Sequence, residues 1–464
     1  MDSHFTIEMR RGSKMQLQRS FGEMADHDSI ENPGSEIMAH IVFVECTHLG
    51  VQAIEAAKRF GHRVSLVTSG KVDWLLTEDN KRTIRENVDH VWKTDNTQSI
   101  AAVRRALIEC REAYPIDAVL SMLHQCVPAT TAAAADLGLR TTDPRGIQNA
   151  RDKTRCRQLL DAANISSVKH ATVTTAEQAL AALKEIGYPA IIKPRTGMGK
   201  LITTFVHEDV EVVRHFEQAN AELMSLDGSL RNELTLEFIV EEIAVGPLYS
   251  IEVGASAHGE WMPFAILRRK TGLHNPILEM GSVIPCGLSD AQYDEVADYA
   301  IRVLKALALD LGIFHVEFIY TSDGPRLVEV NPRIAGGTIP DLVRAATGVN
   351  LFECLVRIYL GERINMTKLP CNIAASQSLI GVAESCTVRE DLPENWFEPI
   401  RRRLHSGNVN IRAGQAVKKM QTSYDVYGVV RTTADSYDEV LKRAEEFYIE
   451  VERTLGIKLT EIRN

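Results

Sequence analysis

Residues 314–337 have the sequence FHVEFIYTSDGPRLVEVNPRIAGG. Apolar runs at 315–320 and 327–330 flank a turn with Asp323-Gly324, and this pattern predicts a β-hairpin. Gly336-Gly337 follows the hairpin, where a backbone without side chains can approach a ligand closely. The stretch therefore combines a buried strand pair with a candidate binding site at one end.

The register of this hairpin determines where its acidic residues lie. A loop with an odd number of residues, such as 322–324 with Thr321 facing Pro325, places Glu317 directly opposite Glu329 on one face. The other face is then apolar and suited to a core, with Val316, Phe318, Val328 and Val330. A two-residue loop would turn Glu329 to the apolar face, so the sequence predicts the odd loop.

The shared polar face carries the chemistry. Glu317, Glu329 and Asn331 offer hard oxygen ligands of the kind that Mg²⁺ takes together with nucleotide phosphates. Arg333 adds a guanidinium that can hold a phosphoryl group or a carboxylate through two parallel bonds. The alternative is a solvated strand face, because glutamate is common at such positions.

Composition limits the class of protein. The chain has 464 residues, which predicts several domains, and 45% hydrophobic with 25% charged residues is typical of a soluble globular protein. The formal net charge of −10, without a basic stripe, argues against a nucleic-acid partner. Eight scattered cysteines without a CxxC pair indicate reduced thiols and a cytoplasmic location.

The sequence also shows no hydrophobic targeting segment. No apolar run is long enough to span a membrane, so no membrane partner is expected. Residues 1–37 lack the apolar segment of a signal peptide and are interpreted as a disordered leader that is not part of the fold.

The first folded segment alternates strands and helices. Strands at 41–45 and 62–68 flank a helix at 51–61, which is how a doubly wound α/β domain opens. The first turn has only Gly50, so it is no dinucleotide fingerprint. His124, after a later strand, either contacts substrate or is a structural residue.

Glycines and lysines in the middle of the chain suit nucleotide phosphates. Beyond a boundary near residue 143, a helix predicted over 149–165 holds Lys153 in its first turn. Lys193 ends a strand at 190–192, and the flexible loop Gly197-Met198-Gly199 follows. Backbone N–H groups and a cation can cradle phosphates there, although the spacing is not that of a Walker A loop.

Two connections follow. Residues 243–247 join strands at 234–242 and 248–253, and backbone groups at this hinge either bind an adenine or only make a tight connection.

Residues 268–285 are predicted to be a long polar loop. This loop either binds acidic substrate groups or is mobile and solvated, and its polar residues include Arg268, Arg269, Lys270, His274 and Glu279.

The chain resembles the ATP-grasp carboxylate-amine ligases in the motifs HVEF and VEVNPR and in the upstream lysines and glycines. The resemblance covers roughly residues 149–362 and is closest to the L-amino-acid (dipeptide) ligase branch. The resemblance implies an ATP-grasp fold that binds ATP and Mg²⁺. It implies ATP-binding residues Lys153, Lys193, Gly197, Gly199, Glu241, Glu242 and Ile243, metal ligands Glu317, Glu329 and Asn331, substrate-binding residues Arg268, His274, Glu279 and Arg333, and catalytic residues Arg333 and Gly337.

The resemblance has two departures. Leu248 stands where many such proteins have a glutamate for the ribose, and Ser282 stands where amino-acid ligases tend to have a histidine. Ribose contacts and the substrate are therefore the parts of the site that the resemblance leaves open.

The implied architecture is α/β, with a Rossmann-like domain at 38–143, an ATP-grasp domain at 144–365 and a small α+β lobe at 366–464. The implied reaction activates a small carboxylic or amino acid as an acyl phosphate and couples it to an amine, releasing ADP and phosphate. A carboxylase that uses bicarbonate and a catalytically silent nucleotide-binding protein are the alternatives. Family members often form homodimers, so a homodimer is expected.

Overall fold

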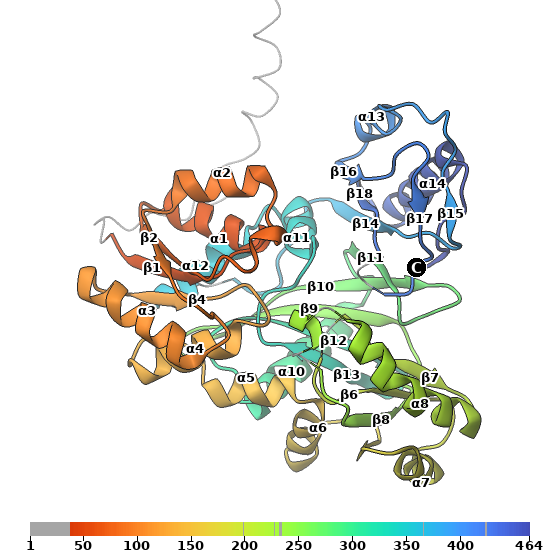
Figure 1. Cartoon of the computed structure of the whole chain (residues 1–464), viewed down its shortest axis with the longest axis horizontal. Helices are drawn as coiled ribbons and strands as arrows, with labels where there is room; N and C mark the ends of the chain where they lie inside the picture. The colour runs from red at the N-terminus through yellow and green to blue at the C-terminus, as the bar shows by residue number, and fades with distance from the viewer. Residues whose placement is uncertain (1–37, 198, 227, 232–233, 365, 423–424) are drawn as a thin grey trace, which may run out of the picture. The chain divides into compact units, whose positions relative to one another are not determined.

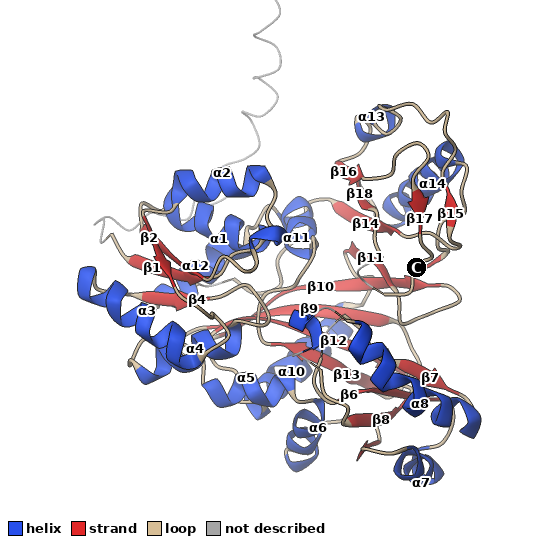
Figure 2. Cartoon of the chain, in the orientation of Figure 1, coloured by secondary structure: helices blue, strands red, loops and turns tan. Residues whose placement is uncertain are grey.

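The computed structural model describes residues 38–464, apart from positions 198, 227, 232–233, 365 and 423–424. The expected leader at 1–37 lies outside the described residues, as does Met198 of the glycine loop. Residues Ala39–Asn464 form one compact unit of mixed α/β structure (Figures 1 and 2). In the described part of the chain, no helix is both long and apolar enough to cross a membrane.

The first segment forms a parallel sheet, called here the N-terminal sheet, with strand order β3-β2-β1-β4. Ile41 and Phe43 of β1 face one core and Val42 and Val44 face another, as expected for a strand covered by helices on both faces. The elements of this segment are β1 (His40–Val44), α1 (His48–Arg59), β2 (Arg63–Thr68), η1 (Asp73–Leu75), α2 (Glu78–Asn87), β3 (His90–Lys93), α3 (Ile100–Ala113), β4 (Ala118–Leu120) and α4 (Val127–Asp136). The doubly wound opening is confirmed.

A small antiparallel sheet follows, with strand order β5-β8-β6-β7 and a core of its own. Its elements are β5 (His170–Val173), α7 (Ala176–Ile186), β6 (Ala190–Pro194), β7 (Thr204–Val206), α8 (Asp209–Ser225), α9 (Gly228–Arg231) and β8 (Phe238–Glu242). Two helices precede it, α5 (Pro144–Arg151) and α6 (Lys153–Ala162). The single helix predicted over 149–165 is wrong, because the Asp152 side chain accepts a hydrogen bond from the Arg155 N–H and caps α6 at a break after Arg151.

The largest layer is an antiparallel sheet, called here the large sheet, with strand order β13-β12-β9-β10-β11-β14-β18-β16 and β19 beside β10. Its strands are β9 (Leu248–Ala255), β10 (Trp261–Gly272), β11 (Glu279–Ile284), β12 (Gly312–Thr321), β13 (Gly324–Asn331), β14 (Ala374–Ile380), β16 (Ser406–Val409), β18 (Gly428–Ala434) and β19 (Ile462–Arg463). Because β11 pairs with β14, the sheet runs without a break from the middle of the chain into its last hundred residues. The expected boundaries near 143 and 365 stay predictions.

Helices and a short strand pair complete the fold. These elements are α10 (Asp290–Ala306), α11 (Ile339–Thr347), α12 (Leu351–Leu360), β15 (Cys386–Thr387), α13 (Glu398–Arg401), β17 (Ala416–Val417) and α14 (Tyr437–Leu455). Helix α12 packs against α1, so the N-terminal sheet is joined to the large sheet through a shared core.

The hairpin β12–β13 has the predicted pairing but a different loop. Glu317 lies opposite Glu329, as predicted, whereas Thr321 pairs with Gly324 across a two-residue loop. A β-bulge reconciles the two observations, because Phe318 pairs with Leu327 and leaves Val328 as the additional residue. The odd loop was therefore wrong, and Leu327 takes the core position that was predicted for Val328.

The predicted polar loop at 268–285 is also wrong for most of its length. Residues Arg268–Thr271 belong to β10 and pair with residues Glu279–Val283 of β11. The Lys270 ammonium is buried and donates hydrogen bonds to Ser376 Oγ at 2.7 Å and Ser378 Oγ at 3.2 Å. Charged side chains suggested solvent exposure, but here they are buried and bonded within the sheet.

Candidate active site

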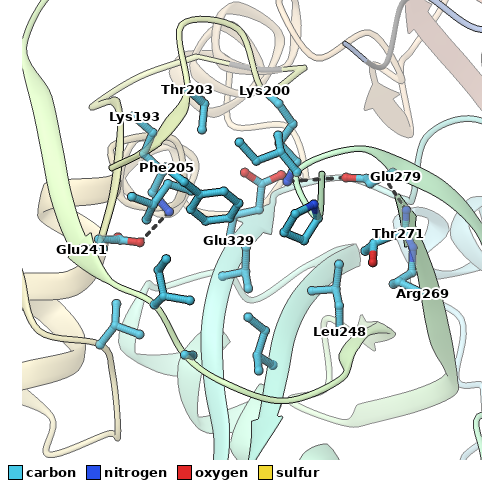
Figure 3. Close-up of a pocket in the computed structure, with 18 of the residues that line it drawn as sticks. Lys193, Lys200, Thr203, Phe205, Glu241, Leu248, Arg269, Thr271, Glu279 and Glu329 are labelled. Carbon is cyan, nitrogen blue, oxygen red and sulfur yellow. Dashed lines mark hydrogen bonds and ion pairs between the residues drawn. The ribbon is translucent and has the colours of Figure 1, made fainter. Parts of the chain in front are cut away.

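Two adjoining cavities lie where the small antiparallel sheet meets the large sheet. The first, of about 580 Å³, is lined by strands of both sheets (Figure 3). The second, of about 590 Å³, is lined by the large sheet, the segment after β13 and the N-terminal segment. The residues common to both cavities are Lys153, Gly197, Gly199, Lys200, Arg269, Glu279 and Glu329. Groups at this common wall can act on molecules in both cavities.

An ion-pair network forms the inner end of the first cavity. Lys193 Nζ lies 2.6 Å from Glu241 Oε2, and Arg157 Nε donates to Glu241 Oε1 at 2.9 Å. Burial alone would raise the pKa of Glu241, but the charges of Arg157 and Lys193 outweigh it and lower that pKa to about 2. Lys153, at the start of α6, lines the same cavity, and burial lowers its pKa to about 8. Cations therefore gather where nucleotide phosphates could bind.

The rest of the first cavity is mostly apolar. Glu242 ends β8, and Ile243 with the other hinge residues leads from it to β9 along the cavity wall. Apolar side chains from both sheets face the same space, namely Val168, Ile191, Phe205, Leu248, Ile319 and Val328. An apolar slot with exposed hinge backbone at one side and lysines at its end fits a nucleotide in size and polarity.

Of the two hairpin carboxylates, Glu329 belongs to the common wall and Glu317 lines the second cavity. Glu317 and Glu329 are cross-strand neighbours, and Asn331 Nδ2 donates to Glu329 Oε1 at 3.2 Å, so that Asn331 Oδ1 is the side-chain atom that can bind a metal. Glu317 Oε2 is buried and has no hydrogen-bond partner among the described residues. Burial favours a raised pKa for Glu317, yet the charge of Lys200 and the bond from His315 outweigh it and lower the pKa.

This donor set fits Mg²⁺. The two carboxylates and the amide are hard oxygen ligands, and the orphaned Glu317 oxygen is the kind of buried atom that a cation satisfies. Within the described range, no three His, Cys, Asp or Glu side chains gather to hold a metal. Magnesium usually takes one or two carboxylates and fills its other positions with phosphate oxygens and water, so the set suits an ion that arrives with a nucleotide.

The second cavity is basic near the carboxylates. Arg333 is partly buried, burial lowers its pKa, and its Nη1 donates to the Ile334 carbonyl at 2.8 Å. His48 Nε2, from α1, lies 3.1 Å from the Gly337 carbonyl oxygen. Burial and then the charge of Arg151 hold the pKa of His124 well below its ordinary value, so this imidazole is neutral. The far wall comes from the last strands and carries uncharged groups, among them Gln377, Asn408, Asn410 and Tyr427.

Comparison with known proteins agrees with this geometry. The sequence family described as the ATP-grasp domain matches residues 186–341. The chain contains an ATP-grasp domain. The crystal structure of an L-amino acid ligase from Bacillus licheniformis has the same fold, with a TM-score of 0.70 and 18% identity over 93% of this chain and 100% of that chain.

Curated relatives resemble the chain at low identity. Alanine–anticapsin ligase from Bacillus amyloliquefaciens is 25% identical over 299 residues, which are 60% of this chain and 63% of that protein. An uncharacterized protein, y4rH, from Sinorhizobium fredii is 26% identical over 389 residues, 80% of this chain and 75% of that protein. The family match begins at residue 186, so Lys153 lies outside the part of the ATP-grasp domain that it covers.

The ATP-grasp domain brings most of the expected site residues to the two cavities. Gly197, Gly199 and Glu279 line both cavities, and Asn331, Arg333 and Gly337 line the second. Arg268 lines the first cavity, not the second. His274 is exposed and lines neither cavity, and its Nε2 lies 3.0 Å from Glu461 Oε2. The structure therefore gives His274 no position from which to contact a substrate in these cavities.

Several charged residues of the site were missed from the sequence, although Arg269 was named there as part of the predicted polar loop. Lys200 Nζ lies 3.4 Å from Glu279 and 3.6 Å from Glu317, and Arg269 Nη2 is 2.5 Å from Glu279 Oε2. His315 Nδ1 contacts the fully buried Glu252, while its Nε2 is 3.1 Å from Glu317 Oε1. His315 shares a strand face with Glu317, which was an available signal. Arg157 and Glu252 gave no such signal in the sequence, because each belongs to an element far in sequence from the hairpin.

Proposed function

We propose that this protein is an ATP-dependent, ADP-forming carboxylate-amine ligase. It joins a small carboxylic or amino acid to an amine or amino acid through an amide bond. The observation that carries the proposal is the common wall, where Lys153, Lys200 and Glu329 face both cavities. A phosphoryl group held at the end of the first cavity is thereby adjacent to an acid held in the second.

The residues have separate tasks in this reaction. Lys153 and Lys193 bind the phosphates of ATP, and the hinge at Glu242 and Ile243 binds the base. Arg333 holds the carboxylate of the acid substrate in line with the γ-phosphorus. Mg²⁺, held by Glu317, Glu329 and Asn331, would supply charge that offsets the negative charge developing on the phosphoryl oxygens.

The bonds change in two steps. A carboxylate oxygen of the acid bonds to the γ-phosphorus while the bond to the bridging oxygen of ADP breaks, which gives an acyl phosphate. The amine nitrogen then attacks the acyl carbon, phosphate leaves, and the nitrogen loses its proton. Water would hydrolyse the acyl phosphate, and the buried position of Glu317 at the reacting centre limits the entry of water.

The resemblance to amino-acid ligases supports amino acids as substrates. The alanine–anticapsin ligases and the L-amino acid ligase are named for joining amino acids, at 25% and 18% identity respectively. A cytoplasmic location, where ATP and free amino acids meet, and a homodimer are part of the same proposal.

The test is the release of ADP, AMP and phosphate from ATP and Mg²⁺ across a panel of acids and amines, given singly and in pairs. Equal release of ADP and phosphate that requires one acid and one amine, with an amide detected by mass spectrometry, is the expected result. Release of AMP would overturn the acyl-phosphate route. Turnover that requires bicarbonate would identify the carboxylase alternative, and nucleotide binding without turnover would favour the silent protein.

A further inference from the structure

The last strand of the chain is anchored beside the first cavity. The Tyr448 hydroxyl, on α14, donates to the carbonyl of Thr460, beyond the end of that helix, at 2.8 Å. Ile462 packs on a cluster that contains Leu278 and Met280. Strand β19 then pairs with β10, with Arg463 opposite Thr271. The path is fixed by hydrogen bonds and by an apolar anchor.

This path brings two polar residues into the wall of the first cavity. Arg463 and Asn464 both line it, together with Arg268 and Thr271 of β10. Arg463 Nη2 donates to the Leu273 carbonyl at 3.0 Å, and Arg268 Nη2 donates to the Asn464 carbonyl at 3.2 Å. The Asn464 backbone is therefore bonded to β10, and Asn464 is part of the cavity wall.

Several polar groups of this cavity suit the charged parts of a nucleotide, while Thr203 and Thr271 add uncharged hydroxyl groups to its lining. Lys153, Lys193 and Lys200 suit phosphates, and Glu329 suits a cation. Leu248 follows directly after the hinge and lines the cavity, and its side chain offers no polar atom. Figure 3 draws Leu248 and Thr271 on one side of the cavity, with Lys193 and Glu241 on the other.

A nucleotide sugar carries two hydroxyl groups that lose water when the nucleotide binds, and each needs a polar partner. Arg268 of β10 lines the first cavity, and its Nη2 binds the Asn464 carbonyl. The polar residues that the large sheet contributes to this cavity therefore include those of the last strand. A carboxamide both donates and accepts, as a hydroxyl group does.

We propose that Arg463 and Asn464, supported by Arg268, bind the sugar hydroxyl groups of ATP, so that the last strand completes the nucleotide site. This inference rests on the proposed function, because it takes ATP as the occupant of the first cavity. Arg463 and Asn464 lie far in sequence from the segment at 186–341 that matches the ATP-grasp domain, whereas Arg268 lies within it.

The experiment measures equilibrium binding of ATP and of 2′,3′-dideoxyATP by calorimetry, without acid or amine so that no turnover occurs. The full-length protein is compared with Asn464→Ala and Arg463→Met. The wild type is expected to bind ATP at least tenfold more tightly than dideoxyATP, because the analogue leaves buried polar groups without partners. Each variant is expected to reduce this ratio of affinities at least threefold, mainly by weakening the binding of ATP.

Lys458→Met is the matched control, since Lys458 is an exposed cation on the same segment and pairs with Glu452 at 2.9 Å. It is expected to keep the wild-type ratio. Asn464→Ala retains the carbonyl that Arg268 binds, so it tests the inference even where Arg463→Met perturbs the strand.

Three results would overturn the inference. One is a wild-type protein without preference for ATP over dideoxyATP, and another is a pair of variants that retain the wild-type ratio. The third is an equal loss of ATP and dideoxyATP in the variants, which would assign the two residues to the phosphates or the base. A wild type that binds neither nucleotide would overturn the proposed function as well.

Discussion

Glu317 is the residue on which the metal site depends most, because its Oε2 is buried without a hydrogen-bond partner among the described residues and has the Lys200 ammonium 3.6 Å away. Glu317→Gln keeps the side-chain volume and removes the charge. We expect ATP turnover to fall by about 100-fold, which is typical when a group that stabilises transition-state charge is lost. Steady-state ADP release, and Mn²⁺ binding in the presence of ADP followed by electron paramagnetic resonance, would both show the loss.

Glu55→Gln is the control for this prediction. Glu55 is exposed on α1, far in sequence from the hairpin, so the same chemical change is expected to leave both measurements as in the wild type. A Glu317→Gln protein with wild-type turnover would contradict the assignment of Glu317.

Arg157 supports the site from behind. Its side chain is 2% exposed, and besides Glu241 it binds the carbonyl of Val328, the additional residue of the bulge, at 2.9 Å. Arg157→Met leaves Glu241 with Lys193 alone. We expect the free energy of unfolding to fall by roughly 3 kcal/mol, the usual cost of breaking a buried ion pair from one side.

Arg302→Met is the matched comparison for urea denaturation. Arg302 Nε lies 2.9 Å from Asp298, the same distance as in the buried pair, but the two side chains are 50% and 70% exposed. An exposed pair contributes about 0.5 kcal/mol. Equal losses in the two variants would mean that burial does not determine the strength of the Arg157 pair.

At the scale of an element, helix α8 carries a titratable group into the core of the small antiparallel sheet. The His215 ring packs edge-on against Phe238 of β8, with the ring centroids 5.1 Å apart. Burial lowers the pKa of His215 to about 4, whereas in an unfolded chain it is about 6.5. Between these values the unfolded chain binds a proton that the folded chain excludes. The free energy of unfolding therefore falls as the pH is lowered from 6.5 to 4.

His215→Phe removes this contribution and keeps an aromatic ring against Phe238. Between pH 7 and pH 4.5, the wild type is expected to lose roughly 2 kcal/mol more unfolding free energy than the variant. Urea denaturation at the two pH values measures the difference. If both proteins lost the same amount, His215 would not be buried in its neutral form.

At the scale of the whole molecule, the large sheet joins the carboxylate hairpin to the last hundred residues through the pairing of β11 with β14. Gly281 lies in this pairing with φ +139°, and a Cβ atom there would lie 2.1 Å from the Gln377 carbonyl oxygen. Lys270, which pairs with Gly281, reaches Ser376 and Ser378 across the same region. The close approach of the two strands therefore requires glycine at position 281.

Gly281→Ala is expected to lower the unfolding free energy by about 3 kcal/mol or more, because the backbone of β14 would have to move. Gly259→Ala is the control, since Gly259 has φ +76° but open space around it and should cost only about 1 kcal/mol of backbone strain. Denaturation midpoints of the two variants decide the matter. Similar costs would show that β14 can move away freely.

The sequence by itself determined the hairpin, the positions of Glu317 and Glu329 on its two strands and the alternating strands and helices of the N-terminal segment. Those features depend on periodicity and on neighbours a few residues apart, which a sequence displays directly. It failed for β3 and α2, because β3 is only partly buried and no residue of α2 is buried in the structure. Without an apolar stripe, neither element leaves a pattern.

Only the tertiary structure decided the bulge, the burial of Arg269 and Lys270, and the position of Lys200 among the carboxylates. The bulge at Val328 is held by Arg157 of α6 and by the Tyr299 hydroxyl, which accepts the Leu327 N–H at 2.8 Å. A charged residue can be buried when such distant partners bind it, and no local sequence pattern indicates where those partners are. The arrival of Arg463 at the first cavity has the same origin, because β19 is placed by pairing with a strand almost two hundred residues earlier.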